Sequence, residues 1–484
     1  MALMVSISGI RGVVGETLTP ETIVKYASAY ALYCNRGHII VGRDGRITGK
    51  NVLDIVASTL LQMGCDITDL GICPTPTVAL AIEKLKAAGG ISITASHNPM
   101  IWNGLKFFAS TGLFLDADEN REFWHLAEQP AKYVSWDKQG KYTLQETFLD
   151  EHIREVLSLS YIDIGKIRAR KFKVVLDCVN SAGGIIVPRL LEKLGCEIIP
   201  IHCEMTGIFG HTPEPIPENL TALCKKVREE HADIGIAVDP DVDRLVLINE
   251  KGEPFGEEYT IASCTKFILG KISAQNLSRT QRGISASLRQ SQIAPAHNAG
   301  SPLRSDNPPS LKVVVNLSTT RAVEDIAKQY GASTLRTPVG EINVAKKMQE
   351  VGAVIGGEGS GGVIFPKVHL GRDAIVGIAL VLQHLTEFGG TISELKAALP
   401  QYSITKGKVD LGTLNPDAIL KQLAADHSVS DTINTDDGLK IDFPASWVHL
   451  RKSNTEPIIR IIAEAHTKAE ADELVKKFTA KILA

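Results

Sequence analysis

The feature that most constrains the fold of this chain is an alternation of short, β-branched apolar runs with helical patterns. In the first part of the chain, apolar runs at residues 38–42, 66–72 and 90–94 enclose helical patterns at 51–64 and 75–88. Strands separated by single helices form βαβ units, in which the strands lie parallel and the helices cover the sheet. This part of the chain is therefore predicted to be an α/β domain with a mainly parallel sheet.

The same alternation restarts twice, at "KFKVVLD" from residue 171 and at "KVVVNLS" from residue 312. The C-terminal part differs, because two helical patterns there flank the strand-like runs "GLKIDF", "SWVHLRK" and "IIRIIAEA". We therefore expect three similar α/β domains with mixed, mainly parallel sheets, followed by a C-terminal α+β domain. The predicted domains are residues 1–155, 156–257, 258–386 and 387–484.

One segment departs from this pattern. Residues 276–311 are rich in Ser, Arg, Gln and Pro and show little periodicity. A segment of this composition buries too little apolar surface to offset the entropy lost on ordering. We predict a flexible insertion in the third domain, with a functional lid as the alternative.

Composition narrows the class of partner. The formal net charge is -3, with both signs mixed along the chain, so there is no broad basic surface for nucleic acid. The N-terminus lacks the features of a secretory signal and no apolar run could span a bilayer, so a cytoplasmic protein without a membrane partner is expected. The eight cysteines form no CxxC pair and are interpreted as reduced core thiols. A small-molecule substrate is favoured.

Four loops carry residues suited to chemistry, and the first is "ISITASHNPM". It places Ser96 beside His97 after an apolar run. A hydrolase elbow needs glycines where Thr94 and Asn98 stand, so acyl transfer is disfavoured. Because adjacent side chains leaving a strand point to opposite faces, we expect His97 to be badly placed to accept the Ser96 proton. A helix or turn cap is the alternative interpretation.

The second loop, "DPDVDR", holds three acids at alternate positions between two apolar runs. Asp239, Asp241 and Asp243 would repel one another by roughly 1 to 4 kcal/mol per pair unless a cation lies between them. Mg2+ is the natural partner of such a carboxylate set. An EF-hand is excluded because Arg244 replaces its obligatory glycine and the flanks are strands. A solvent-exposed acidic turn is the alternative.

The third loop is "VIGGEGSGGVIFP". Gly357, Gly359 and Gly362 match G-x-G-x-x-G, but a strand-like run follows where a dinucleotide site needs a helix, which argues against NAD. Glu358 and Ser360 among these glycines suit hydrogen bonding to sugar hydroxyls. A glycine-rich turn without function is the alternative.

The fourth loop is "RKSNTEPIIR". Ser453, Asn454 and Thr455 supply hydroxyl, amide and backbone donors, and Arg451 and Arg460 flank them. Such a cluster indicates a phosphate-binding loop in a chain that is otherwise not basic. A solvated turn is the alternative.

These four loops in this order, together with "SGIRG" near the N-terminus and "NGLKFF" after Ser96, resemble the α-D-phosphohexomutase superfamily. The resemblance covers essentially the whole chain except residues 276–311. It implies that the four domains surround a central active-site cleft. It also implies an isomerase that interconverts hexose 1-phosphates and 6-phosphates.

By this resemblance, Ser96 carries a phosphoryl group that it donates to the sugar and later takes back. A hexose 1,6-bisphosphate is the implied intermediate and activator, and the sugar turns end for end between the two transfers. The implied metal is Mg2+, held by phosphorylated Ser96 with Asp239, Asp241 and Asp243. The phosphate on the non-reacting end would occupy the fourth loop.

The resemblance also assigns roles to single residues. Arg11 and Lys106 fall beside the transferring phosphoryl group, where cations stabilise spread charge, and Lys106 is a candidate for proton transfer. His97 and Arg244 would orient the phosphoserine and the metal carboxylates. His369, in "VHLGRDA", is a further candidate for substrate binding and proton transfer.

The variable positions of the third loop bear on the sugar. Glucosamine-selective relatives tend to carry a "GGEQSGH"-like loop, and glucose or mannose enzymes a "GEMSGH"-like one. The double glycine before Glu358 favours glucosamine phosphate, whereas Gly362 stands where both groups have histidine. A phosphoglucosamine mutase is therefore predicted, with a phosphomannomutase/phosphoglucomutase of broader specificity as the alternative.

Two hypotheses of other classes follow from the same residues. A HAD-type phosphatase would use Asp239 as nucleophile and Asp241 as acid/base. A non-catalytic sensor would bind a sugar phosphate without turnover. The expected partner is a hexose or hexosamine phosphate, and the chain is expected to be a monomer or a homodimer.

Overall fold

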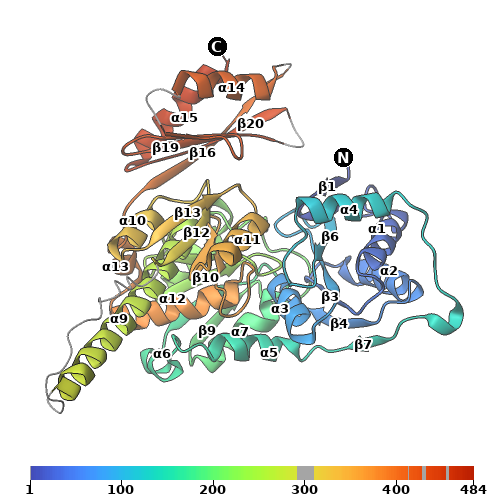
Figure 1. Cartoon of the computed structure of the whole chain (residues 1–484), viewed down its shortest axis with the longest axis horizontal. Coiled ribbons are helices and arrows are strands. Elements are labelled where there is room, and N and C mark those ends of the chain that lie inside the picture. The colour runs from blue at the N-terminus through green and yellow to red at the C-terminus, as the bar shows by residue number, and fades with distance from the viewer. Residues whose placement is uncertain (1, 292–309, 413, 428–431, 454–456, 484) are drawn as a thin grey trace.

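The computed structural model describes residues 2–291, 310–412, 414–427, 432–453 and 457–483. These residues form four sheets of seven, four, four and five strands. In Figure 1 the first unit lies to the right, the second and third units are packed together in the centre, and the C-terminal unit stands above the third. The expected three α/β units and C-terminal α+β unit are confirmed.

The first unit is an α/β domain. Its strands are β1 (Met4–Ser6), β2 (Gly9–Val13), β3 (Ile39–Arg43), β4 (Ile67–Ile72), β5 (Gly89–Ile93), β6 (Trp102–Phe108) and β7 (Tyr142–Leu144). Its helices are α1 (Pro20–Tyr33), α2 (Gly49–Gln62), α3 (Thr75–Leu85), α4 (Ala117–Ala127) and the 3-10 turn η1 (Trp136–Lys138). The sheet order is β1-β2-β6-β5-β3-β4-β7, parallel from β5 to β7 and antiparallel from β1 to β5.

The second unit has a four-stranded sheet in which β11 alone is antiparallel to its neighbour. Its strands are β8 (Lys173–Asp177), β9 (Glu197–Ile201), β10 (Ile234–Val238) and β11 (Leu245–Ile248), in the order β11-β10-β8-β9. Its helices are α5 (Phe148–Leu157), α6 (Ile164–Arg170), α7 (Gly183–Lys193), the 3-10 turn η2 (Pro217–Asn219) and α8 (Thr221–Glu230).

The third unit repeats this plan, with β15 antiparallel at the edge of a four-stranded sheet. Its strands are β12 (Lys312–Asn316), β13 (Ser333–Thr337), β14 (Ile355–Glu358) and β15 (Gly362–Ile364), in the order β13-β12-β14-β15. Its helices are α9 (Glu257–Ser291), α10 (Ala322–Gln329), α11 (Glu341–Val351), α12 (Ala374–Phe388) and α13 (Ile392–Ala397).

The C-terminal unit is an antiparallel five-stranded sheet covered by two helices. Its strands are β16 (Ser403–Asp410), β17 (Thr432–Asn434), β18 (Leu439–Asp442), β19 (Trp447–Lys452) and β20 (Ile458–Ala465), in the order β16-β20-β19-β18-β17. Its helices are α14 (Pro416–His427) and α15 (Lys468–Leu483).

The buried apolar residues show how the units are joined. One continuous core runs from α3 of the first unit through the second sheet to α12 of the third unit. The rest of the first unit and the C-terminal unit have separate cores. The C-terminal unit is therefore attached by surface contacts and not by a shared core, which suits a part that moves relative to the others.

The segment 276–311 was predicted to be a flexible insertion, but its first part belongs to a helix. Helix α9 continues to Ser291, so the first part of this segment is helical. The helix starts inside the apolar core of the third unit, and adding residues to an existing helix costs far less than starting one. Residues 292–309 lie outside the described residues, and the predicted domain boundaries stay predictions.

None of the helices in the described parts of the chain combines the length and the apolar character that a membrane span needs.

Candidate active site

A cavity of about 490 Å³ lies where the four units meet. Its volume is in the range of small-molecule sites. Eight of the residues predicted from the sequence line it: Arg11, His97, Lys106, Arg244, Glu358, Ser360, Arg451 and Arg460. The fold thus brings together side chains from loops at opposite ends of the chain.

Ser96 lies behind the cavity wall, in the loop between β5 and β6. It is 2% exposed and its φ of +49° is left-handed. Its hydroxyl lies 3.2 Å from Asp239 Oδ2 in the second unit. The predicted serine and the acidic loop therefore meet across the interface of the first two units.

The expected orientation of His97 is wrong. His97 Nδ1 lies 3.2 Å from Ser96 Oγ, within hydrogen-bond distance. The left-handed backbone at Ser96 ends the alternation of strand side chains on which the expectation depended. Burial, with help from Arg244 and Arg11, lowers the pKa of His97 to about 2. The imidazole is therefore neutral at physiological pH and can accept the serine proton in a hydrogen bond.

Arg46 holds the Ser96 loop, and no motif in the sequence indicated it. Its side chain is 1% exposed and donates to three loop carbonyls: Ser96 O at 2.6 Å, Asn98 O at 2.8 Å and Pro99 O at 2.9 Å. Its Nε lies 3.0 Å from Asp44 Oδ2. One guanidinium thus binds Ser96 O and Asn98 O, which have no backbone donor among the described residues, and Pro99 O, which also accepts from Trp102 N at 3.0 Å.

Arg46→Met is expected to lower the free energy of unfolding by about 3 to 5 kcal/mol, because it leaves Asp44 as an unpaired buried charge and removes the donors of the Ser96 loop. Urea unfolding followed by circular dichroism measures the change. Arg36→Met is the control, since Arg36 is exposed and donates to a single carbonyl. An unchanged unfolding midpoint in Arg46→Met would show that the guanidinium does not hold the loop.

The acidic loop is not an exposed turn. Asp239 and Asp241 are 0% exposed and Asp243 is 1% exposed. One oxygen from each lies within 4.8 Å of the others. Asp241 Oδ1 and Asp243 Oδ1 are buried without a hydrogen-bond partner among the described residues. Such orphaned carboxylate oxygens fit a hard divalent cation.

The pKa of Asp239 shows the cost of this arrangement. Burial raises the pKa of Asp239 well above its ordinary range, and the neighbouring charges of Asp243 and Asp241 raise it further. Its Oδ1 accepts from the backbone amides of Asp243 and Arg244, which fixes the turn. A cation between the three carboxylates would remove the repulsion that now opposes ionisation.

Protein cations lie beside the triplet, and the sequence indicated Lys106 and Arg244 but not Arg372. Arg244 Nε lies 3.8 Å from Asp243 Oδ1. Lys106 Nζ lies 2.6 Å from Asp241 Oδ2 and 3.4 Å from Asp243 Oδ2. Burial alone disfavours its charge, but these carboxylates raise the pKa of Lys106 above its ordinary value. Lys106 is therefore a cation in this arrangement and can donate hydrogen bonds to a phosphoryl group.

Arg372 is the cation that the sequence did not indicate, and it joins the acidic loop to the glycine-rich loop. Its Nη2 lies 2.7 Å from Asp243 Oδ2, and its Nη1 lies 2.6 Å from Glu358 Oε2. Its Nε lies 3.1 Å from Glu341 Oε2. A Cβ on Gly362 would lie 2.3 Å from Arg372 Cδ, so glycine at this position makes room for the arginine. This close packing explains why the loop has glycine at position 362.

Glu358 is engaged by the protein on both oxygens. Its Oε1 accepts from Asn316 Nδ2 at 2.8 Å and from Gly340 N at 3.1 Å, and its Oε2 faces Arg372. Ser360 lies in the cavity wall two residues later. Glu358 therefore orients the loop at least as directly as it could contact a sugar.

The phosphate-binding loop is described in part. Arg451 and Arg460 face each other across β19 and β20 and line the cavity. Arg451 Nε lies 2.9 Å from Asp437 Oδ2. Ser453 follows β19 but is not among the lining residues, and Asn454 and Thr455 lie outside the described residues. Two arginines at one end of the cavity can bind a phosphate.

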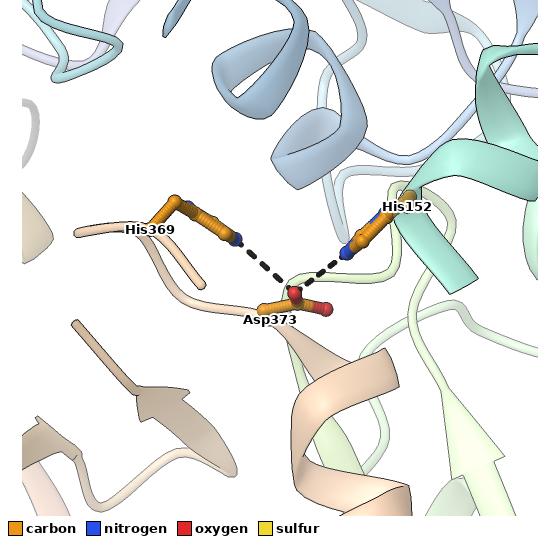
Figure 2. A group of neighbouring side chains, drawn as sticks. All are labelled: His152, His369 and Asp373. Atoms are coloured by element: carbon orange, nitrogen blue, oxygen red, sulfur yellow. Dashed lines mark hydrogen bonds and ion pairs between the residues drawn. The ribbon is translucent and has the colours of Figure 1, made fainter. Parts of the chain in front are cut away.

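His369 does not line the cavity. It is 3% exposed, and its Nε2 lies 3.1 Å from Asp373 Oδ2, which also accepts from His152 Nε2 at 2.8 Å (Figure 2). His152 in turn contacts Thr77 on α3. Asp373 is also the N-cap of α12. The hydrogen bond to Asp373 holds His369 where α3, α5 and α12 of the first three units meet. The predicted contact of His369 with substrate has no support from this geometry.

Comparison with known proteins agrees with the fold and the cavity. Four family models match consecutive parts of the chain. They are phosphoglucomutase/phosphomannomutase alpha/beta/alpha domain I at residues 4–133, domain II at 150–252, domain III at 297–402 and the C-terminal domain at 407–481.

Full-length relatives and solved structures match as well. A "Probable phosphoglucosamine mutase" of Methanopyrus kandleri is 33% identical over 97% of this chain and 96% of its own. A "Phosphoglucomutase/phosphomannomutase" of Thermococcus kodakarensis is 32% identical over 97% of this chain and 96% of its own. A family protein of Burkholderia thailandensis has the same fold, with a TM-score of 0.79 at 24% identity over 99% of this chain and 98% of that one.

An Aspergillus fumigatus N-acetylphosphoglucosamine mutase, solved in complex with GlcNAc-6P and magnesium, has a TM-score of 0.56 at 14% identity, over 99% of this chain and 95% of that one. At these identities the solved structures show the fold alone. The fold, the cavity and the matches together define an isomerase of the phosphohexomutase class. The chain belongs to the phosphoglucomutase/phosphomannomutase family, which confirms the resemblance stated from the four loops.

Proposed function

We propose that the protein is a phosphoglucosamine mutase, which interconverts glucosamine 6-phosphate and glucosamine 1-phosphate through a phosphoserine at Ser96. The observation that carries this proposal is the meeting of Ser96 Oγ and Asp239 Oδ2, 3.2 Å apart, behind a cavity to which all four units contribute. Relatives named phosphoglucosamine mutase, which match 97% of the chain, support the sugar. The relative of Thermococcus kodakarensis supports the alternative of broader specificity.

The acidic triplet would hold Mg2+ together with the phosphate of Ser96. Its orphaned carboxylate oxygens fit this ion, and the magnesium in the Aspergillus fumigatus structure supports the choice. When bound, the ion supplies positive charge to the phosphoryl group that is transferred. Lys106 and Arg372 would also offset the negative charge of the phosphoryl group and the triplet, because both contact carboxylates of the triplet.

The transfer itself exchanges one oxygen–phosphorus bond for another. The bond between Ser96 Oγ and phosphorus breaks, and a bond forms between phosphorus and the free hydroxyl oxygen of the sugar. The proton of that hydroxyl ends on Ser96 Oγ, where the neutral His97 can accept it in a hydrogen bond. The product of this step is a hexose 1,6-bisphosphate. After the sugar has turned, the other phosphate returns to Ser96.

This scheme needs a second phosphate site, and Arg451 with Arg460 provides it. The non-reacting phosphate occupies the same site in both orientations of the sugar. Its binding energy can therefore align the reacting hydroxyl as well as retain the sugar.

Arg451→Ala is expected to lower kcat/KM by roughly 100-fold for every hexose phosphate, because a charged hydrogen bond to the non-reacting phosphate is lost in all of them. The ranking of the sugars should stay the same. Steady-state kinetics on several hexose phosphates measures both quantities. Lys452→Ala is the matched control, because Lys452 follows on the same strand but is exposed and paired with Asp417. A changed ranking with full overall efficiency would contradict this role.

The proposed function is tested by a coupled assay that compares glucosamine, glucose, mannose and N-acetylglucosamine phosphates with one enzyme preparation. Glucosamine phosphate is expected to have the highest kcat/KM. Similar values for glucose and mannose phosphates would favour the broader alternative. Absence of turnover with all four would favour the sensor hypothesis. A cytoplasmic location and a monomeric or homodimeric state stay predictions.

A further inference from the structure

Glu258 lies in the cavity wall and has no role in the mechanism above. It is in the first turn of α9 and lines the same cavity as the predicted residues. A Cβ on Gly359 would lie 1.8 Å from Glu258 Oε2 and 2.3 Å from Glu258 Oε1. The carboxyl group is therefore pressed against the backbone of the glycine-rich loop, and glycine at position 359 leaves room for it.

The two oxygens of this carboxyl group differ. Oε2 accepts from the backbone amide of Thr320 at 2.9 Å, which fixes the orientation of the group. Oε1 accepts no hydrogen bond within the described part of the chain. It is not one of the fully buried side-chain atoms that lack a hydrogen-bond partner. One acceptor is thus held in place and available to a bound molecule.

Glu258 is also the unpaired carboxyl among those that line the cavity. The other two, Glu341 and Glu358, are both bound by Arg372. The cation that acts on Glu258 is Lys406, whose ammonium is bound by Glu257. Burial raises the pKa of Glu258 well above its ordinary range, although Lys406 opposes this shift. A cationic partner supplied by a ligand would favour the charged form of this carboxyl group.

We propose that Glu258 is the specificity-determining residue that binds the amino group of a hexosamine phosphate. The inference rests on the proposed function and names the residue that distinguishes the sugars. The cavity is lined by Arg11, Lys106, Arg244 and Arg372, which suit phosphate but repel an ammonium group. An amino sugar therefore needs a local carboxylate, whereas a hydroxyl at the same carbon does not. Charge-assisted hydrogen bonds are about twice as strong as neutral ones, so this contact favours an amino sugar over a sugar with a hydroxyl at that carbon.

Glu258→Gln tests the proposal, because the amide keeps the shape and an acceptor for Thr320 N, while it removes the charge and replaces the second acceptor oxygen with an NH2 donor. For glucosamine 6-phosphate, kcat/KM is expected to fall by roughly 10- to 100-fold, the worth of one charged hydrogen bond. For glucose 6-phosphate and N-acetylglucosamine 6-phosphate, which lack a cationic amino group, the change should be less than about 3-fold. Glu253→Gln is the matched control, because this exposed carboxyl precedes α9 and does not line the cavity.

Each other outcome contradicts the role. An equal loss with all three sugars would show a shared structural contribution of Glu258, and an unchanged ratio would show that the amino group binds elsewhere. In either case hexose phosphates are still turned over, so the proposed function stands while the inference fails. If the wild-type enzyme turns over none of them, both fail together. Gly359→Ala is the second variant, since its Cβ displaces the carboxyl group, and it should reproduce the selective loss if Glu258→Gln unfolds.

Discussion

Replacing Ser96 with alanine is expected to lower mutase turnover by several orders of magnitude while the fold persists. The proposed reaction passes through a bond between Ser96 Oγ and phosphorus, and alanine cannot form it. The side chain contributes little to stability, because it makes only loop contacts, to Asp239 and His97. The coupled assay measures turnover, and thermal unfolding of the same preparation measures stability.

Ser110→Ala is the control for this variant. Ser110 is an exposed serine in the turn after β6, so its loss should leave both turnover and unfolding temperature unchanged. Normal activity in Ser96→Ala would exclude the phosphoserine mechanism. It would leave the HAD-type hypothesis, in which Asp239 is the nucleophile.

Removing Mg2+, or one of the carboxylates that would bind it, is also expected to have a large effect on turnover. EDTA should abolish turnover, and excess Mg2+ should restore it. Asp241→Asn should lower turnover by roughly 100-fold or more and raise the Mg2+ concentration needed for half-maximal activity, because one charged ligand is lost. The same substitution weakens the contacts of Asp241 with Lys106 and Thr75, both at 2.6 Å.

Asp233→Asn is the matched control for charge, because Asp233 is exposed at the start of β10 and lies outside the triplet. Its activity and Mg2+ requirement should equal those of the wild type. Turnover that is unaffected by EDTA would show that the triplet does not serve a catalytic metal.

The alternation of strands and helices was sufficient to predict the parallel strands of the first three sheets apart from β7. It did not predict the antiparallel side of the first sheet, formed by β1, β2 and β6. Strand β6 is buried along its whole length, so it lacks the alternating pattern by which a half-exposed strand is found in a sequence. Helix α9 was not predicted, and its last part lies in a segment whose polar composition indicated a flexible insertion.

The site was predictable where one loop carries the chemistry, as with Ser96 and the acidic triplet. It was not predictable where a side chain reaches the site through space. Arg372 precedes α12 and lies in the run "VHLGRDA", which was considered only for His369, and Glu258 lies in the first turn of α9, outside the motifs considered. The signal that could have indicated them is the pair of glycines they pack against, Gly362 and Gly359.

The same limit applies to the Ser96 loop. Arg46 is fifty residues from Ser96 in sequence, and its four contacts follow only from the folded backbone. The error about His97 has a single cause, the left-handed φ at Ser96, which a non-glycine residue adopts too rarely to be expected from sequence.

Transfer of a label from the phosphorylated enzyme tests the central claim most directly. The enzyme is labelled with 32P at Ser96, separated from free label and mixed with unlabelled glucosamine 6-phosphate. We predict that acid-stable label leaves the protein, passes through a hexosamine 1,6-bisphosphate and ends in sugar monophosphate. Label that stays on the protein, leaves only as inorganic phosphate, or proves acid-labile as an aspartyl phosphate at Asp239 would contradict the phosphoserine mutase.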